Sequence, residues 1–455
     1  MRRLFHSVFI VTALAVGSLN ANADVASPSP DTSNALYVSE AGGSNRNDGS
    51  KESPFKNIQK AVDAASDGAT IFVAEGNYFG VLGKGNINVT KPVKIYGGYS
   101  PDFSTRDVLK HRTLVQPSHE ANGTTEAVGG TVNINVKTAG TVVVLDGLLF
   151  DRGNSISYNA KGEGKPEGVE SPMMNAVGTA GIGGADLKAE GVLTKDTAEI
   201  YLDNASCDVF VENCAFINAP CYGIRGMFGG AKAVINNNIF INNRMAAVEI
   251  TSGGLAKDTK EVHFSNNTVL FMWSRLKDFG DMGYGYRYMT GINSYVTRNI
   301  IGLATFAGLE RMRVDSDKAK EAERVTTAEH NIFFLNKQGD LLLPGGGMGM
   351  RVKAEDFEEV EQLAKVAGNK TLTDPAIFKG VINEAYLGGF LAASYKETTS
   401  VDANSPANTF RQALGMNMTG TMESSATMFA NRYPWEEALK FFGAVEGCGA
   451  QKIKN

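Results

Sequence analysis

The sequence predicts an all-β protein built as a parallel β-helix, a solenoid whose coils stack on one another. Three features support this prediction: strand-like segments follow one another without helices between them, a short apolar unit containing Asn recurs, and one amphipathic helix precedes most of the strands. The 455 residues are enough for several average domains or for one elongated domain, and the repeats favour the elongated domain.

The strand-like segments are rich in Val, Ile and aromatic residues and are separated by Gly, Asn or Pro. In the first third of the chain they are ALYVS (35–39), TIFVA (70–74), VKIYGGY (93–99), TLVQ (113–116), TVNINV (131–136) and TVVVLDGLLF (141–150). Because no helix-length pattern separates them, alternating βαβ units are disfavoured.

The repeated unit is clearest between residues 211 and 335. Five segments carry Asn shortly before an apolar residue: VENCAFIN (211–218), INNNIFIN (235–242), FSNNTVLF (264–271), VTRNIIGL (296–303) and AEHNIFFL (328–335). The apolar positions are Phe216, Phe240, Val269, Ile301 and Phe333, which lie 24 to 32 residues apart. We expect them to form one buried column, with Asn at the corners because it tolerates left-handed backbone and can form ladders.

One amphipathic helix is predicted within GSNRNDGSKESPFKNIQKAV, residues 43–62. Ser53 can cap its N-terminus, Pro54 suits its first turn, and Asp67 and Gly68 would end it. Its apolar face would contain Phe55, Ile58, Val62 and Ala65. Because a β-helix exposes core side chains at its open ends, we expect this helix to cover the N-terminal coil.

The N-terminus has the pattern of a secretory signal peptide. Arg2 and Arg3 precede a short apolar run, and Ala21 and Ala23 provide small residues before the expected cleavage site. A membrane anchor is the competing interpretation. We expect an exported protein, periplasmic or extracellular, with no membrane span in the mature chain.

The predicted organisation has four parts. They are a signal peptide (1–23), a linker (24–35), a parallel β-helix (36–345) with an insertion (155–198), and a C-terminal helix and capping tail (346–455), the helix being expected at 352–366. The Gly-rich insertion is expected either to wall a groove or to be disordered.

Charge and cysteine content narrow the functional classes. With 44 basic and 49 acidic residues the net charge is −5, and no segment is strongly basic, so no nucleic-acid partner is expected. Export permits disulfides among Cys207, Cys214, Cys221 and Cys448, with three pairings open and free buried thiols as the alternative. Their spacing is not that of a zinc site, and nothing specifies an oligomeric state.

Several motifs resemble those of a known family. They are LYVS (36–39), NDG (47–49), PFKNIQKA (54–61), IFVAEGNY (71–78), VKIYGGYS (93–100), LDGLLF (145–150), TDPAIF (373–378) and NSPAN (404–408). Together they resemble right-handed parallel β-helix proteins of the pectin-lyase-like superfamily, across about residues 36 to 408. The resemblance implies a right-handed coil, while the family includes polysaccharide lyases, hydrolases, epimerases and proteins of no known activity.

The substrate of such a fold is expected on an outer sheet, across stacked strands. Arg225, Glu249 and Glu310 lie nine residues after Phe216, Phe240 and Ile301, and Asn293 is expected in the same outer row in the intervening coil. The residues before them, Ile224, Val248, Ile292 and Leu309, would point inward. Arg244 and Arg311 are predicted to contribute to the same substrate-binding surface.

Candidate catalytic residues cluster between positions 275 and 288. They are Arg275, Lys277, Tyr284, Arg287 and Tyr288. A lyase acting on an acidic polysaccharide must neutralise a uronate carboxylate, a role for Arg275, Arg287 or Arg311, and must supply a base, a role for Lys277, Tyr284 or Tyr288. Glu249 and Glu310 could instead bind Ca²⁺ or form the carboxylate pair of a hydrolase.

Structural interpretations compete with each of these roles. Alternating Arg and Glu can be a solvated charge ladder, and GYGYRYM (283–289) can pack its rings on the scaffold. His263 and His330 are expected to be strand or corner residues, and GSNRNDG a structural turn. The Lys coil followed by an RHG coil found in β-helix lyases is not present.

Two functions remain: an enzyme acting on an acidic polysaccharide by β-elimination, or a non-catalytic carbohydrate-binding or envelope protein.

Overall fold

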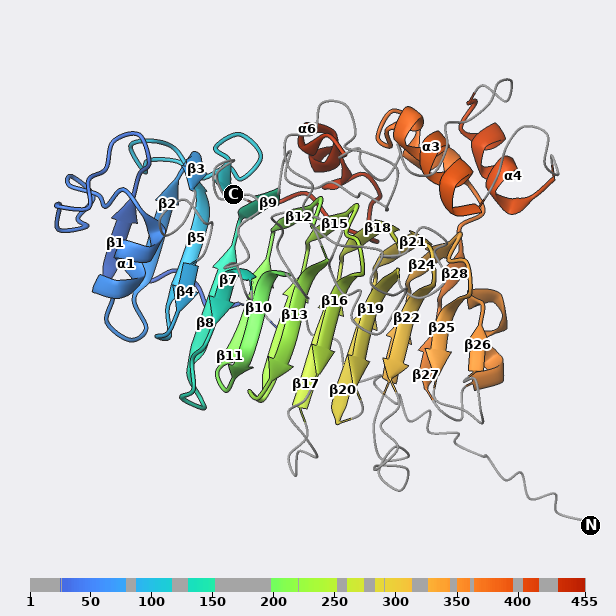
Figure 1. The fold of residues 1–455 in the computed structure, drawn as a ribbon, viewed down its shortest axis with the longest axis horizontal. Coiled ribbons are helices and arrows are strands. Elements are labelled where there is room, and N and C mark those ends of the chain that lie inside the picture. Colours follow the sequence, from blue (N-terminus) through green and yellow to red (C-terminus); the bar gives the residue numbers. More distant parts are fainter. Residues whose placement is uncertain are drawn as a thin grey trace, which may run out of the picture.

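A computed structural model of the chain confirms the parallel β-helix (Figure 1). The structure describes residues 25, 27–78, 87–116, 130–151, 198–219, 221–251, 260–273, 283–289, 291–312, 326–343, 350–360, 364–395, 404–416 and 433–454. The signal-peptide prediction (1–23) and nearly all of the predicted insertion (155–198) lie outside these residues. Within them, no helix has the length and apolar character needed to cross a membrane.

Three long sheets run the length of the solenoid. Sheet A contains, in spatial order, β1 (Ala35–Val38), β2 (Thr70–Ala74), β5 (Lys94–Tyr99), β8 (Val142–Asp146), β11 (Asp208–Glu212), β14 (Lys232–Asn236), β17 (Lys260–Ser265), β20 (Ile292–Thr297), β23 (Thr326–Glu329) and β27 (Lys365–Ala367). Sheet B contains β3 (Gly76–Tyr78), β6 (Thr113–Val115), β9 (Leu148–Asp151), β12 (Ala215–Ile217), β15 (Ile239–Ile241), β18 (Thr268–Met272), β21 (Ile300–Ala304), β24 (Ile332–Phe334) and β28 (Lys370–Thr371). Sheet C contains β4 (Ile87–Val89), β7 (Gly130–Ile134), β10 (Ala198–Ala205), β13 (Tyr222–Phe228), β16 (Ala246–Thr251), β19 (Tyr284–Met289), β22 (Ala307–Met312), β25 (Gly339–Leu343) and β26 (Met350–Val352).

From β2 to β25 each coil contributes one strand to each sheet, so that β11, β12 and β13 form one coil and β14, β15 and β16 form the next. The coils wind right-handed and their strands pair in parallel, while the terminal pair β25–β26 is antiparallel. The segment predicted as one strand at 141–150 is two strands, β8 and β9, because the chain turns at Gly147 with a φ of 71°.

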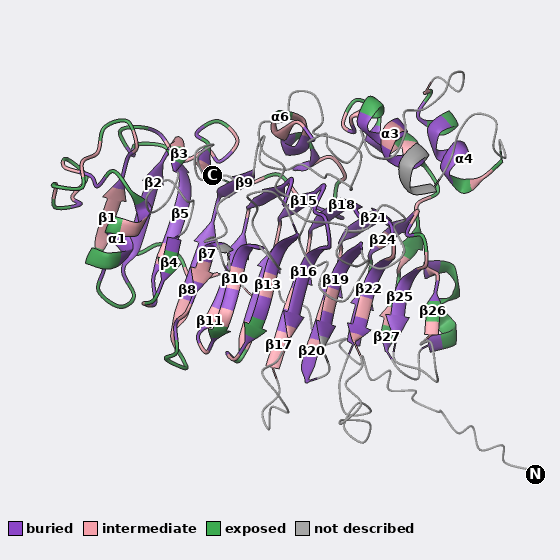
Figure 2. Ribbon diagram, viewed as in Figure 1, coloured by how far each residue is buried: buried purple, intermediate pink, exposed green. Residues whose placement is uncertain are grey.

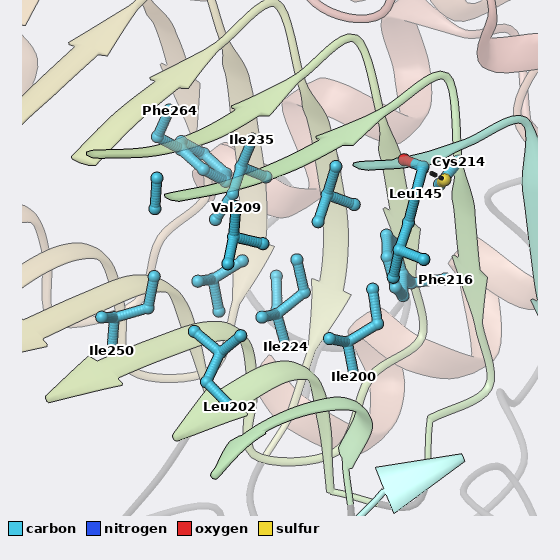
Figure 3. Packing of buried hydrophobic residues seen from close by; sticks show 14 of the residues in the cluster. Leu145, Ile200, Leu202, Val209, Cys214, Phe216, Ile224, Ile235, Ile250 and Phe264 are labelled. Atoms are coloured by element: carbon cyan, nitrogen blue, oxygen red, sulfur yellow. Dashed lines mark hydrogen bonds between the residues drawn. The ribbon is translucent and has the colours of Figure 1, made fainter. Parts of the chain in front are cut away.

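The predicted column of apolar residues is confirmed. Phe216 pairs in register with Phe240, and the same register continues through Val269, Ile301 and Phe333, all with no exposed surface. The rings of Phe216 and Phe240 stack with centroids 4.6 Å apart. Figure 3 shows Phe216 beside other inward side chains, including Ile224, which together fill the interior of the coils. This interior core removes a continuous apolar surface from water, which stabilises the fold.

An asparagine ladder lines the corner between sheets A and B. Asn267 Oδ1 accepts hydrogen bonds from the backbone N of Asn238 (3.0 Å) and from its Nδ2 (3.1 Å). Asn299 and Asn331 repeat the arrangement in the following coils. In the first unit Cys214 occupies the ladder position, and its backbone N donates to Asn238 Oδ1 (2.9 Å). The ladder satisfies backbone groups that the sharp corner leaves without strand partners.

The residue before each ladder position adopts a left-handed backbone conformation. The φ values are 53° at Asn213, 57° at Asn237, 51° at Asn266, 54° at Arg298 and 57° at His330. The prediction that His330 is a corner residue is therefore confirmed, and His263 lies in strand β17 as expected.

Both ends of the interior core are covered by short helices. At the N-terminal end, α1 (Ile58–Ala64) buries Ile58, Ala61 and Val62 against the first coils. The predicted start at Ser53 is wrong: Asn57 is the N-cap, because Phe55 is drawn into a β-bridge with Val38.

At the opposite end, the 3-10 helix η6 (Ala354–Val360) joins the interior core. It replaces the longer helix predicted at 352–366, since β27 and β28 follow it. The solenoid therefore extends to Thr371, beyond the boundary predicted at 345.

The C-terminal tail turns back over sheet B (Figures 1 and 2). Its helices are η7 (Pro375–Phe378), α3 (Glu384–Tyr395), α4 (Pro406–Ala413), α6 (Trp435–Ala438) and η8 (Leu439–Phe441). A second apolar core forms between the outer side of sheet B and tail residues such as Phe441 and Phe442. Tyr433 N donates to Asn218 Oδ1 (2.8 Å), which anchors the returning chain to the coils.

The four cysteines are free and buried. The alternative of free thiols is therefore the one that the structure supports, and none of the three disulfide pairings forms. Burial raises the pKa of the Cys207 thiol to about 12, so this thiol stays protonated at neutral pH.

Asn267→Ala tests the ladder. We expect a loss of at least about 2 kcal/mol in unfolding free energy, because more than one buried polar group loses its partner at about 1–3 kcal/mol each. Urea-induced unfolding measures it. Asn88→Ala is the matched control, since this exposed side chain should change stability by less than about 0.5 kcal/mol. Equal losses in the two variants would contradict a structural role for the ladder.

Candidate functional site

Seven polar side chains form a row along the outer side of sheet C, which we call the outer row. In order along the solenoid they are Asn88, Asn133, Tyr201, Arg225, Glu249, Arg287 and Glu310, each paired in register with the next. The residues that precede four of them, Ile224, Val248, Tyr286 and Leu309, point into the interior core. Strand alternation therefore aims the outer row at the surface, one side chain per coil.

Ion pairs join the last four members of the outer row. Glu249 receives Arg225 Nε on Oε1 (2.9 Å) and Arg287 Nη1 on Oε2 (2.9 Å). Arg287 Nε also donates to Glu310 Oε2. Arg287 thus lies between the two carboxylates and binds both.

The network is largely shielded from water. The Glu249 side chain is 6% exposed, while Arg225, Arg287 and Glu310 are 26%, 22% and 19% exposed. Burial lowers the pKa of Arg287, but Glu310 and Glu249 outweigh it and hold this pKa above its ordinary value. Each guanidinium also lies over a tyrosine ring, Arg225 over Tyr222 (4.8 Å) and Arg287 over Tyr284 (4.6 Å). The charged half of the row is therefore a fixed, mutually neutralised network more than a freely solvated ladder.

The prediction that Asn293 belongs to this row is wrong. Asn293 lies in β20 of sheet A and pairs with Glu261, and Arg287 occupies the expected place between Glu249 and Glu310. Arg287 follows the column residue Val269 by 18 residues, so that a count of nine residues loses the register there.

The tyrosines of GYGYRYM (283–289) face the scaffold. This segment is strand β19, with Tyr286 and Tyr288 fully buried and Tyr284 nearly so. Burial raises the pKa of Tyr288 to about 12, and its hydroxyl bonds Thr326 Oγ1 (2.5 Å). Tyr288 is therefore protonated at neutral pH and out of contact with solvent, which does not suit the predicted role of base.

Of the remaining predicted residues, the two that the structure describes do not belong to the outer row. Arg244 is fully buried at the corner before β16, 5.6 Å from the Trp273 ring, and Arg311 lies on the inward face of β22 opposite Tyr288. Lys277 and Arg275 lie outside the described residues.

Sequence reasoning missed the N-terminal half of the outer row. Tyr201 precedes Arg225 by 24 residues, the same step that separates Phe216 from Phe240, and this step could have identified it. Asn133 donates through Nδ2 to Asn88 Oδ1 (3.0 Å), which orders the first two members.

The outer row can offer hydrogen bonds and an aromatic ring, but its two cations are matched by two carboxylates. Within the described part of the chain, no group of three His, Cys, Asp or Glu side chains is placed to hold a metal ion. The arrangement suits a ligand with many hydroxyl groups better than one recognised by net charge alone.

The fold and the outer row define a class: a right-handed parallel β-helix with a polar row on one sheet, the fold that the resemblance to the pectin-lyase-like superfamily implies. The family model described as protein of unknown function (DUF1565) matches residues 41–146. No curated protein matches the chain.

Solved structures show distant similarity. A GH136 lacto-N-biosidase from Eubacterium ramulus is 12% identical with a TM-score of 0.36, covering 74% of this chain and 60% of its own. The pectate lyase Pel9A is 12% identical with a TM-score of 0.31, and the match covers 75% of this chain and 80% of the lyase chain. A pectin methylesterase from Aspergillus niger is 14% identical with a TM-score of 0.24, and the match covers 71% of this chain and 89% of the methylesterase chain. The chain thus spans 60% of the length of the lacto-N-biosidase. The fold assignment rests on the sheet topology described above.

Arg287→Met tests the ion-pair network. The change leaves two carboxylates without their shared cation, so we expect a loss of about 1–3 kcal/mol, between the values typical of exposed and buried pairs. Arg225→Met, at the more exposed end, should cost about 1 kcal/mol or less. Urea unfolding of both variants measures this, and an Arg287→Met protein as stable as the parent would show that the pairs contribute nothing.

Proposed function

We propose that this is an exported protein that binds an extended polysaccharide along the outer row. The observation that carries the proposal is the register of seven polar side chains, one on each of seven consecutive strands of sheet C. The signal-peptide pattern of residues 1–23 supports export.

The dimensions of the outer row suit a linear glycan. Strands in a sheet lie about 4.8 Å apart, so that seven of them span roughly 29 Å. A sugar chain lying across the strands would meet a new amide, ring, guanidinium or carboxylate at each step. These planar groups exchange hydrogen bonds with sugar hydroxyls, and Tyr201 can face the apolar side of a sugar ring.

Binding is favoured over β-elimination by the described residues. Arg287, a predicted neutraliser of the uronate carboxylate, already binds Glu249 and Glu310. Tyr288, a predicted base, is buried. β-Elimination remains the second candidate, because Lys277 and Arg275 shortly precede strand β19 in the sequence.

Tyr201→Ala tests polysaccharide binding. With alginate, pectate, glycosaminoglycans and neutral glucans or galactans as a panel, affinity electrophoresis should reveal a ligand whose binding weakens about tenfold in this variant, equivalent to about 1.4 kcal/mol. Tyr295→Ala is the matched control, since Tyr295 lies on sheet A. Equal weakening in both variants, or no ligand in the panel, would refute binding through the outer row.

Lys277→Ala tests β-elimination. The mature protein is incubated with the acidic members of the panel, and unsaturated product is followed in the ultraviolet, with EDTA and with Ca²⁺ because Glu249 and Glu310 were predicted as cation ligands. Under the binding proposal no product forms in any condition. Product that disappears in Lys277→Ala and Arg275→Ala would establish the lyase instead.

A further inference from the structure

A separate cleft of about 430 Å³ lies between the first coils and the returning C-terminal tail, away from the outer row. Its polar walls carry Glu40 and Glu75 from the turns after β1 and β2, Asn77 from β3, Lys110 and Arg112 from the loop before β6, and Trp435 from α6. Leu114 and Leu149 of sheet B contribute apolar surface to the lining. This size is in the range of small-ligand pockets.

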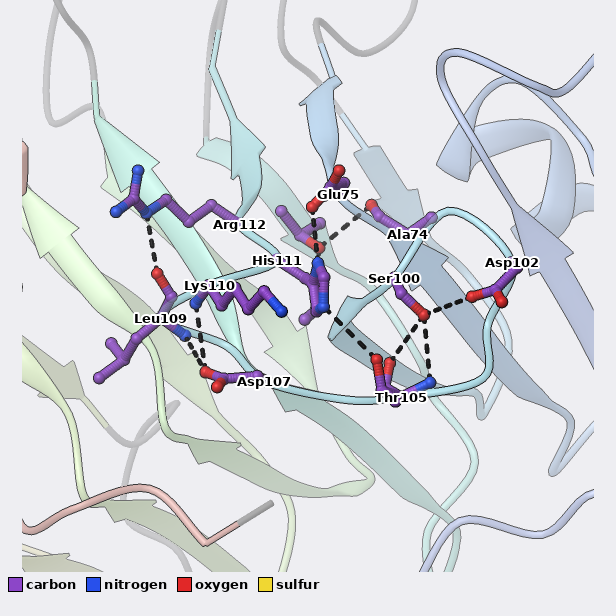
Figure 4. A network of polar contacts seen from close by, with 12 residues as sticks. Ala74, Glu75, Ser100, Asp102, Thr105, Asp107, Leu109, Lys110, His111 and Arg112 are labelled. Atoms are coloured by element: carbon purple, nitrogen blue, oxygen red, sulfur yellow. Dashed lines mark hydrogen bonds and ion pairs between the residues drawn. The ribbon is translucent and has the colours of Figure 1, made fainter.

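The loop that carries the two cations is held rigidly (Figure 4). His111 Nδ1 lies 2.7 Å from Glu75 Oε2, which ties the loop to the turn between β2 and β3. Asp107 Oδ1 accepts from the backbone N of Leu109 (3.1 Å) and Lys110 (3.2 Å). The side chains on either side of His111 therefore start from a fixed backbone, which lowers the entropy lost on binding a ligand.

Arg112 is held in place from two sides. Its Nε donates to Leu109 O (2.9 Å), and its guanidinium carbon lies 4.7 Å from the centroid of the Trp435 ring. Trp435 is itself fixed, because Tyr433 exchanges backbone hydrogen bonds with the Asn218 side chain. Within the described part of the chain, the Nη groups of Arg112 and the Nζ of Lys110 make no ion pair, in contrast to the arginines of the outer row.

We propose that this cleft binds a short saccharide of one or two units that carries a carboxylate. The oriented Nη groups of Arg112 match a carboxylate bidentately, and Lys110 adds a second positive charge. Asn77 and Glu40 can accept hydrogen bonds from sugar hydroxyls. Trp435, Leu114 and Leu149 provide apolar surface for the C–H side of a sugar ring. The proposal goes beyond polysaccharide binding by the outer row, because a ligand of this size cannot span that row.

Tryptophan fluorescence of the mature chain tests it directly. The chain has two tryptophans, of which Trp273 is fully buried and Trp435 lines the cleft. The protein is titrated with D-glucuronate, D-galacturonate and digalacturonate, with glucose and galactose as neutral counterparts and inorganic phosphate as a bare anion. We expect a saturable change in emission with at least one uronate and at least fivefold weaker binding of its neutral counterpart and of phosphate.

Three variants locate the binding. Trp435→Phe should remove the fluorescence response while leaving the emission of Trp273. Arg112→Lys keeps the positive charge but loses the guanidinium, which can bind a carboxylate bidentately. It should raise the dissociation constant for the uronate at least fivefold. Lys379→Ala removes an exposed cation at the far end of the solenoid and should leave the dissociation constant for the uronate unchanged. No saturable response to any uronate, an unchanged response in Trp435→Phe, or equal binding of galactose or phosphate would each overturn the proposal.

Discussion

The stacking of each coil on the next is the constraint on which the rest of the structure depends. Parallel pairing in three sheets makes neighbours of residues that are far apart in the sequence, by 24 to 32 positions for the column residues of sheet B. Inside, Phe216 and Phe240 continue the core from one coil to the next, and at the corner Asn267 satisfies polar groups of the coil before it. Side chains along a strand alternate between the interior and the surface. The register that buries the apolar column therefore also places the side chains of the outer row beside one another.

The three sheets share one interior but differ on their outer sides. Sheet B is covered by the tail, which builds a second apolar core there. Part of sheet A carries an apolar cluster that includes Phe72, Phe210 and Val234. Sheet C carries the outer row, whose members are exposed or partly exposed apart from Glu249. The tail thus covers the outer side of sheet B and leaves the seven hydrogen-bonding groups of the outer row on sheet C.

The two candidate sites differ in how their cations are matched. In the outer row, Arg287 lies between Glu249 and Glu310, so that its charge is neutralised within the protein. In the cleft, Arg112 is oriented by Leu109 and Trp435 without a carboxylate partner among the described residues. The acidic saccharide expected from the sequence is therefore better matched by the cleft, whereas the outer row suits a longer chain rich in hydroxyl groups.

The sequence by itself determined the coil, the buried column and part of the outer row. Arg225, Glu249 and Glu310 were predicted because each follows a column residue by the same count. Arg287 was not placed in the row because its coil contains extra residues, and a fixed count cannot follow the chain through them. Only the tertiary structure brought Trp435 beside Arg112, since the repeat says nothing about a tail that folds back after the last coil. Repetition encodes contacts between neighbouring coils, whereas contacts between distant, non-repeating segments depend on which surface buries the most apolar area.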